Sequence, residues 1–298
     1  MLTQGSFFLN TTQKKSYAKP FLDIEAQIAK LKSRGMIFED EKYAKKQLEN
    51  INYYRLSGYW LIYEENHSTH KFYDNIKFES IINLYIFDRE LRLLFLEAIE
   101  RIEVSIRTRF AHILSQKYSS HFHLKPELFY CPIKYAQTLV KLKSEVNRSK
   151  ETCVVHFKNN YKESLPPIWS SIELMTLGQV SNWFDNLKYR QDKQKIAKFY
   201  NLDEKVLSSF LHHLTIIRNI SAHHSRLWNK KIALDFTLPK NPKELNAQLN
   251  HQKRKYLYNT IIITNYILNF IDEDNNWMNR VEQLIIKYNI DKKRMGYR

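Results

Sequence analysis

The sequence predicts an all-α protein, and three observations carry that prediction. Only five glycines and seven prolines occur among 298 residues, so few positions interrupt a helix. Apolar residues recur at helical spacing over long stretches, whereas half-buried strands would require alternation. The longest such pattern, over residues 78–118, contains no glycine or proline and predicts a helix of about 40 residues.

The N-terminal part begins with a polar stretch and then shows two helix starts. Residues 1–19 are expected to form a flexible lead-in. Asp23 has a side chain suited to capping a helix, and Gly35 is placed to end it. Asp40 is expected to cap a second helix that continues into the aromatic-rich residues 52–60.

The rest of the chain alternates between helical patterns and proline-containing segments. Residues 119–167 lose the apolar period and are expected to form loops with one or two short helices. The doublet Pro166-Pro167 is expected to introduce a helix that ends at Gly178. Further helices are predicted for residues 180–187 and 192–200, from Asp203 onward, and for residues 251–271 and 276–288.

These elements predict one division of the chain. The regions are the lead-in 1–19, an N-terminal helical region 20–75, a helical core 76–229 with a basic insertion around 119–167, and a C-terminal helical extension 230–298. The long helix of the core has an apolar face, and charged side chains gather on the opposite arc. We expect that arc to be a solvated ridge, made of Arg89, Arg92, Glu100, Glu103 and Arg107.

The charge of the chain favours a polyanionic partner. Lysine and arginine outnumber aspartate and glutamate by 47 to 31, and residues 101–162 hold twelve basic against four acidic residues. Nucleic acid is the first inference and an anionic membrane surface the second. Exposed aromatic residues among the basic ones would stack on unpaired bases, and Tyr118, Phe122, Tyr130 and Tyr135 are candidates. The residues expected to contact RNA are Arg55, Lys141, Lys143, Arg148 and Lys150.

Several other classes of protein are disfavoured. The two cysteines, Cys131 and Cys153, have no ligand-like spacing, so the sequence indicates neither a disulfide framework nor a zinc site. The first residues lack the pattern of a signal peptide, and no apolar run is long enough to span a membrane. We therefore expect a soluble, cytoplasmic protein that has no membrane partner and needs no cofactor.

The chemistry is expected in residues 218–229, which contain an Arg-x4-His pattern. On a helical wheel Arg218, Asn219, His223 and Arg226 share one arc, while His224 falls with the aliphatic residues that face a core. A histidine can move a proton near neutral pH, and a guanidinium can stabilise a phosphate in its transition state. This pair suits RNA cleavage in which the ribose 2′-OH attacks the adjacent phosphate and leaves a 2′,3′-cyclic phosphate.

One histidine does not readily serve as both base and acid, so we expect a two-fold homodimer that supplies the second. Asn219 would orient the imidazole or a phosphate oxygen. The spacing alone also arises by chance in helix-rich basic proteins, and His213 is expected to be a core residue. A metal site is disfavoured because adjacent histidines point apart on a helix and no carboxylate recurs at the required spacing.

Residues 218–229 resemble the hallmark of the Abi-like (abortive infection) proteins of bacteria, which are placed in the HEPN superfamily of α-helical ribonucleases. Residues 51–60, 87–107 and 165–169 resemble further segments of the same family, and the resemblance spans about residues 20–229. It implies a HEPN-like helical bundle with additional N-terminal and C-terminal helices. Arg218 and His223 match the Arg-x4-His of the superfamily, and Asn219 matches the polar residue after its arginine.

The resemblance also implies a function. We expect a metal-independent endoribonuclease that acts as a toxin-like effector in antiviral defence, works as a dimer and is controlled by a small structured RNA. Either Glu100 or Glu103 would then orient Arg218 or His223, or Arg107 would hold phosphate, and Arg226 would support the site. The alternative is a catalytically inactive RNA-binding scaffold that acts by sequestration.

Overall fold

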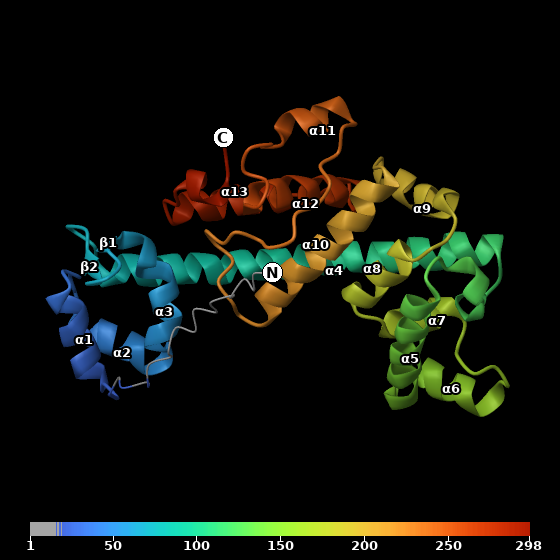
Figure 1. Cartoon of the computed structure of the whole chain (residues 1–298), viewed down its shortest axis with the longest axis horizontal. Helices are drawn as coiled ribbons and strands as arrows, with labels where there is room; N and C mark the ends of the chain where they lie inside the picture. The colour runs from blue at the N-terminus through green and yellow to red at the C-terminus, as the bar shows by residue number, and fades with distance from the viewer. Residues whose placement is uncertain (1–15, 17, 19) are drawn as a thin grey trace, which may run out of the picture. The chain divides into compact units, whose positions relative to one another are not determined.

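The computed structural model describes residues 16, 18 and 20–298. Thirteen α-helices and one two-stranded hairpin form in this part of the chain, so the all-α prediction is confirmed (Figure 1). The predicted lead-in 1–19 lies almost wholly outside the described residues. The chain divides into two compact units, residues up to 82 and residues from 83 onward. Helix α4 (Phe78–Lys117) begins in the first unit and continues through the second, and its 40 residues match the predicted length.

The first unit contains α1 (Ile24–Ser33), α2 (Glu41–Asn50) and α3 (Tyr53–Trp60). The predicted caps are confirmed, since Asp23 accepts a hydrogen bond from the backbone N–H of Ala26 at 2.8 Å and Asp40 one from that of Tyr43 at 2.9 Å. The prediction of one continuous second helix is wrong. Asn52 caps a new helix, because its side chain accepts the backbone N–H of Tyr54 at 2.8 Å and competes with the helical hydrogen bonds.

Strands β1 (Glu64–Asn66) and β2 (Lys71–Phe72) form an antiparallel hairpin that the sequence did not predict. The buried aromatic residues of this unit pack around it, and the Trp60 and Phe72 rings meet edge to face at 6.4 Å. In the aromatic run after Asn52, Tyr59 and Trp60 are therefore core, whereas Tyr53 is half-buried and Tyr54 is 67% exposed.

In the second unit, α4 is covered along part of its length by α12 (Leu257–Ile271) and α13 (Trp277–Lys287) (Figure 1). The Trp277 indole N–H donates to the carbonyl of Leu94 at 2.8 Å, and Arg280 pairs with Glu97 at 2.6 Å. Helix α12 begins at Leu257, later than predicted, and α11 (Lys243–Gln248) is a helix that was not predicted.

The predicted basic insertion forms more helix than expected. Helix α5 (Pro132–Arg148) begins with a proline at its first position, and α6 (Thr152–Asn160) follows it. The four-residue α7 (Ile168–Ser171) and a 3₁₀ turn come next. The sequence underestimated α5 because its apolar face is narrow and lies between exposed lysines.

Gly178 does not end a helix, as the sequence suggested, but lies near the start of α8 (Leu177–Asp185). Thr176 caps this helix through a capping box with Gln179. A Cβ at Gly178 would meet the Thr215 side chain of α10 at 3.1 Å. The glycine therefore permits the close approach of α8 to α10 (Glu204–Ala222), the helix that carries the candidate site.

Helix α9 (Arg190–Ala197) connects α8 to α10, and the predicted cap of α10 is confirmed. Asp203 accepts the backbone N–H of Lys205 at 2.8 Å. No described helix is both long enough and apolar enough to cross a membrane.

His123 is a fully buried histidine, and its surroundings predict a pH dependence of stability. Its ring lies 6.3 Å from that of Trp183, and neither ring nitrogen has a hydrogen-bond partner among the described residues. Burial, with a smaller contribution from nearby His121, lowers the pKa of His123 from 6.5 to about 4. The folded protein therefore keeps this ring neutral at a pH where the unfolded chain binds a proton.

Above pH 6.5 the ring is neutral in both states and the unfolding free energy is at its full value. As the pH falls from 6.5 toward 4, the unfolding free energy decreases, because the unfolded chain binds a proton that the folded protein does not. Wild type should lose about 1.5 kcal/mol of unfolding free energy through His123 between pH 6.5 and pH 5, and we expect His123→Phe to remove this loss. Urea unfolding at both pH values measures it, with the exposed His156→Phe as the control. Equal pH dependence in wild type and His123→Phe would show that His123 takes up its proton in the folded state.

Candidate active site

Helix α10 ends at Ala222, so His223 is its C-terminal cap and the following residues leave the helix. The N–H of Ser225 donates to the carbonyl of Ile220 at 2.9 Å, and that of His224 donates to Ser221 at 3.1 Å. These two hydrogen bonds define a Schellman motif, in which the residue after the cap takes the left-handed conformation. His224 fills that position with φ 56°, where glycine is the usual residue.

The early end of α10 corrects the prediction for His224. A helical wheel placed this histidine in the core, but the wheel does not apply beyond the cap, and His224 is exposed. His213, further back on the same helix, is a core residue as predicted. Its two ring nitrogens bond the carbonyl of Leu234 and the hydroxyl of Thr260, both at 2.8 Å.

Arg218, Asn219 and His223 lie together at this helix end. Arg218 Nη1 donates to Asn219 Oδ1 at 3.3 Å. Asn219 and His223 are four residues apart, and the N–H of His223 donates to the carbonyl of Asn219 at 3.0 Å, so the two residues share a helix face. Asn219 and His223 are exposed and Arg218 is half-buried, which leaves an imidazole and an amide open to a ligand beside a guanidinium.

A buried ion pair on α4 holds the loop that follows His223. Asp88 and Arg92, one helical turn apart, pair with each other and are 0% and 3% exposed. Asp88 accepts the backbone N–H of Leu227 at 3.1 Å and that of Trp228 at 2.6 Å. Arg92 donates to the carbonyl of Ser225 at 3.3 Å. The pair thus fixes three backbone groups of the loop, and two of them, the N–H groups of Leu227 and Trp228, are buried and need a partner.

Sequence reasoning missed this clamp. Arg92 was placed on a solvated ridge, which is wrong because the loop after α10 covers that part of α4. A usable signal was present, since Asp88 and Arg92 stand at i,i+4 within residues 87–107. Leu227 and Trp228 add an apolar anchor beside the clamp at 0% and 1% exposure.

Glu103 of α4 lies close to Arg218. Burial raises the pKa of Glu103, and the positive charges of Arg107 and Arg218 act in the opposite direction. Glu103 is therefore a carboxyl group in a restricted environment that interacts with the guanidinium of the candidate site. Glu100, the other predicted carboxylate, is exposed and contributes a repulsive charge to Glu103.

Arg107 is occupied by contacts within the protein. Its guanidinium pairs with Glu103, donates to the carbonyl of Met175 and lies 3.4 Å from the Glu173 carboxylate. These contacts join α4 to the 3₁₀ turn that precedes α8. They also occupy guanidinium N–H groups that would be needed to bind a phosphate. Arg226, the last predicted supporting residue, is half-buried in the loop.

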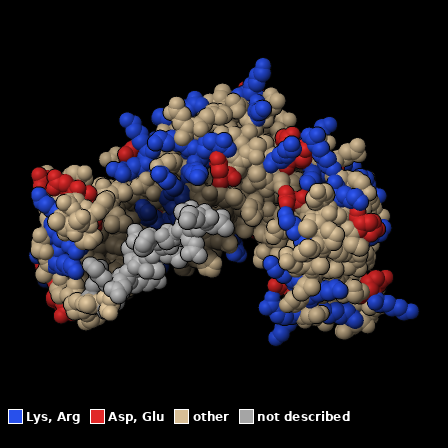
Figure 2. All heavy atoms as spheres, in the orientation of Figure 1, with Lys and Arg blue, Asp and Glu red and all other residues tan. Residues whose placement is uncertain are grey.

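The residues predicted to contact RNA are distributed over both units. Lys141, Lys143 and Lys150 are exposed on or beside α5, where Lys and Arg side chains gather at the lower right of Figure 2. Arg148 is also exposed but pairs with Glu145 at 2.7 Å. Arg55 is exposed in the first unit.

Burial excludes two of the four aromatic residues that were predicted to stack on bases. Phe122 and Tyr135 are 0% and 8% exposed, so their predicted role in stacking is wrong. Tyr118 is half-buried and its hydroxyl donates to Asp192 at 2.6 Å, so Tyr130, at 81% exposure, is the most accessible ring of the four. Among the described residues, no three His, Cys, Asp or Glu side chains are grouped as metal ligands would be.

Comparison with known proteins gives one match. The sequence pattern of a family described as Abi-like protein matches residues 46–229, which is more than half of the chain. The match begins later than the predicted residue 20, ends at the predicted residue 229 and contains the clamp, Glu103 and the Arg-x4-His segment. No curated protein and no solved structure gives a match. The chain belongs to the Abi-like protein family.

Proposed function

We propose that this protein is a metal-independent endoribonuclease of the HEPN type. The observation that carries the proposal is the grouping of Arg218, Asn219 and His223 at the end of α10, on a loop that the buried Asp88–Arg92 pair holds in place. Membership of the Abi-like family suggests a role in abortive infection, and cleavage of RNA is an activity that would arrest an infected cell.

The proposed reaction uses the substrate's own nucleophile. The ribose 2′-OH attacks the adjacent phosphorus, the bond from phosphorus to the 5′-oxygen breaks, and the products end in a 2′,3′-cyclic phosphate and a 5′-OH. A base removes the proton of the 2′-OH, and an acid returns one to the 5′-oxygen. His223 performs one of these transfers, Arg218 stabilises the charge on the non-bridging oxygens, and Asn219 positions a phosphate oxygen or the imidazole.

The second proton transfer requires another group. We place it on His223 of a second copy in a two-fold dimer, because exposed helix ends related by a two-fold axis can face each other across one phosphate. A small structured RNA bound to the basic surface of α5 is the regulator we propose. Lys141, Lys143 and Lys150 are exposed there for contact with a phosphate backbone.

The decisive experiment follows the 2′-OH. Purified protein in EDTA is incubated with a single-stranded RNA, and the cleaved bond is mapped; the same RNA with one 2′-deoxy sugar at that position is then tested. We expect the RNA to be cut to a cyclic phosphate and the deoxy-substituted bond to resist. Cleavage of both would require attack by water and would refute the mechanism. Binding of RNA without any cleavage would identify the protein as an RNA-binding scaffold instead.

A further inference from the structure

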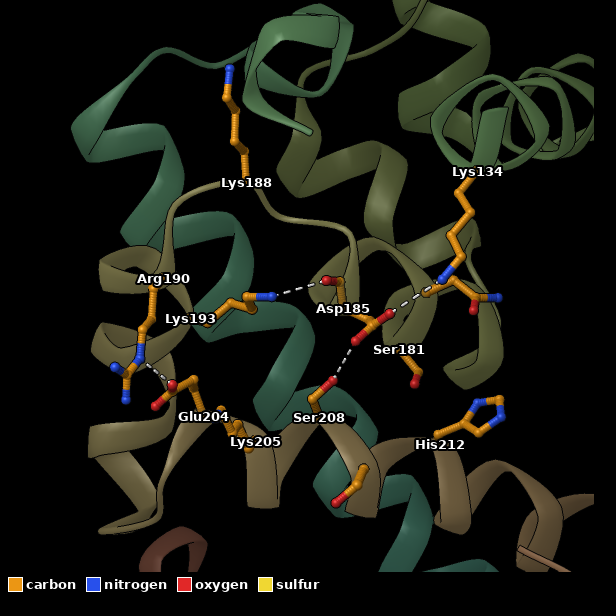
Figure 3. Close-up of a pocket in the computed structure, with 12 residues that line it drawn as sticks. Lys134, Ser181, Asp185, Lys188, Arg190, Lys193, Glu204, Lys205, Ser208 and His212 are labelled. Atoms are coloured by element: carbon orange, nitrogen blue, oxygen red, sulfur yellow. Dashed lines mark hydrogen bonds and ion pairs between the residues drawn. The ribbon is translucent and has the colours of Figure 1, made fainter. Parts of the chain in front are cut away.

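A cavity of about 580 Å³ opens between α8, α9 and α10, toward the N-terminal half of α10 (Figure 3). Two carboxylates, Asp185 and Glu204, belong to its lining. With five cations against these two, the lining carries a net charge of +3 when histidine is neutral. The five cations are Lys134, Lys188, Arg190, Lys193 and Lys205.

Both carboxylates already have cationic partners. The Lys134 ammonium lies 3.6 Å from the Asp185 carboxylate, and Lys193 donates to the backbone carbonyl of Asp185 at 3.0 Å. Arg190 Nε donates to Glu204 at 2.5 Å. Figure 3 shows Lys134 and Lys193 directed at Asp185 from two sides, with the Arg190–Glu204 pair apart from them.

Lys188 and Lys205 are the two cations of the lining that do not pair with Asp185 or Glu204. Both are exposed, and among the described residues neither has a carboxylate at ion-pair distance. In Figure 3 the Lys188 side chain extends away from Asp185. A concave surface whose cations exceed its own carboxylates favours a ligand with several negative charges, and phosphate groups meet this requirement.

The cavity and the candidate active site lie on one face of α10. Five residues lie on one side of this helix because they follow one another at intervals of three, four, seven and four residues. They are Lys205, Ser208, His212, Asn219 and His223. None of them is buried. A ligand that lies along this face can therefore contact the cavity lining and His223 at the same time.

The distance suits a nucleic acid strand. From His212 to His223 the helix rises about 16 Å, at 1.5 Å per residue. A stacked strand rises about 3.4 Å per nucleotide, so about five nucleotides cover this length. A free nucleotide is too short to span it.

We propose that the cavity holds backbone phosphates of the same RNA strand that is cleaved at His223, with His212 at the near edge of the cavity about five nucleotides and Lys205 about eight nucleotides from the scissile bond. The inference rests on the proposed function and assigns the cavity as a distal substrate site. It predicts that the length of the substrate decides whether the cavity contributes to catalysis.

The test is the double variant Lys188→Gln/Lys205→Gln, assayed on a dinucleotide and on a single-stranded RNA long enough to span both sites. We expect KM for the long RNA to rise by about tenfold and KM for the dinucleotide to stay unchanged, because the dinucleotide cannot reach the cavity. Lys240→Gln/Lys243→Gln removes two exposed lysines outside the cavity and is the matched control.

Binding is measured in parallel on proteins that also carry His223→Ala. Two lost phosphate contacts should lower the slope of log affinity against log salt by about 1.4 for a single strand. The inference would be overturned if the double variant had the same KM, affinity and salt slope for the long RNA as the wild-type protein. An equal rise in KM for the long RNA and for the dinucleotide would also overturn it. Tighter binding of a nucleoside triphosphate than of long RNA would assign the cavity to a free nucleotide. If the wild-type protein cuts no RNA, the proposed function fails, and the binding measurement still decides whether the cavity holds RNA phosphates.

Discussion

RNA cleavage by the His223→Ala protein is expected to be slower than wild type by a factor of about 10² to 10⁴, the usual contribution of one general acid or base. His223 is exposed at the end of α10, and alanine removes the proton-transferring ring while the backbone hydrogen bond from His223 to Asn219 remains. The rate should be measured in single turnovers at saturating RNA, so that weaker binding does not contribute.

His224→Ala is the matched control, because His224 is the adjacent exposed histidine of the same cap. We expect its cleavage rate to stay within a few-fold of wild type. Equal loss in both variants would mean that the geometry of the cap matters and not the His223 imidazole. Arg218→Lys tests the other proposed catalytic group, since lysine keeps the charge but lacks the planar fork that contacts two phosphate oxygens.

The Asp88→Ala protein is expected to unfold with a free energy about 3–5 kcal/mol lower than wild type. Alanine leaves the buried Arg92 guanidinium without its carboxylate, and it removes the acceptor of the Leu227 and Trp228 N–H groups. The loop after His223 then loses its attachment to α4. Urea unfolding gives the stability, and the cleavage rate under native conditions shows whether the loop still positions His223.

Glu90→Ala provides the control for the loss of a carboxylate from the same helix. Glu90 lies 3.2 Å from the Lys287 ammonium on a more exposed surface, and such pairs contribute about 0–1 kcal/mol. Asp88→Asn keeps an oxygen acceptor for the loop while it removes the charge, so it should fall between wild type and Asp88→Ala. A stability change for Asp88→Ala no larger than that for Glu90→Ala would contradict a clamping role.

The helical fold was predictable because its signals are local. Asp23, Asp40 and Asp203 cap helices through bonds to residues two or three positions ahead, and such bonds depend on neighbouring residues alone. The hairpin and α11 were missed because both are short and lie in segments of weak pattern. Gly178 was misread because its role is a contact with Thr215, which no local pattern reveals.

The candidate site was predicted in part for the same reason. Arg218, Asn219 and His223 could be recognised because they stand close together in one helical segment. The position at which α10 ends could not be predicted. It depends on the left-handed backbone conformation of His224 and on hydrogen bonds between the loop and α4. The burial of Arg92 was missed because periodicity assigns one covered face to a helix, whereas other segments pack on several sides of α4.

The clamp between Asp88 and the loop has a consequence for synthesis of the protein. The hydrogen bonds from Leu227 and Trp228 join residues 139 and 140 positions apart, so Asp88 leaves the ribosome long before its partners exist. Contacts of such sequence separation close late in folding. We therefore expect a nascent chain that stops before residue 227 to lack the assembled helix end. Under the proposed function, incomplete copies of the chain would therefore lack the RNA-cleaving site.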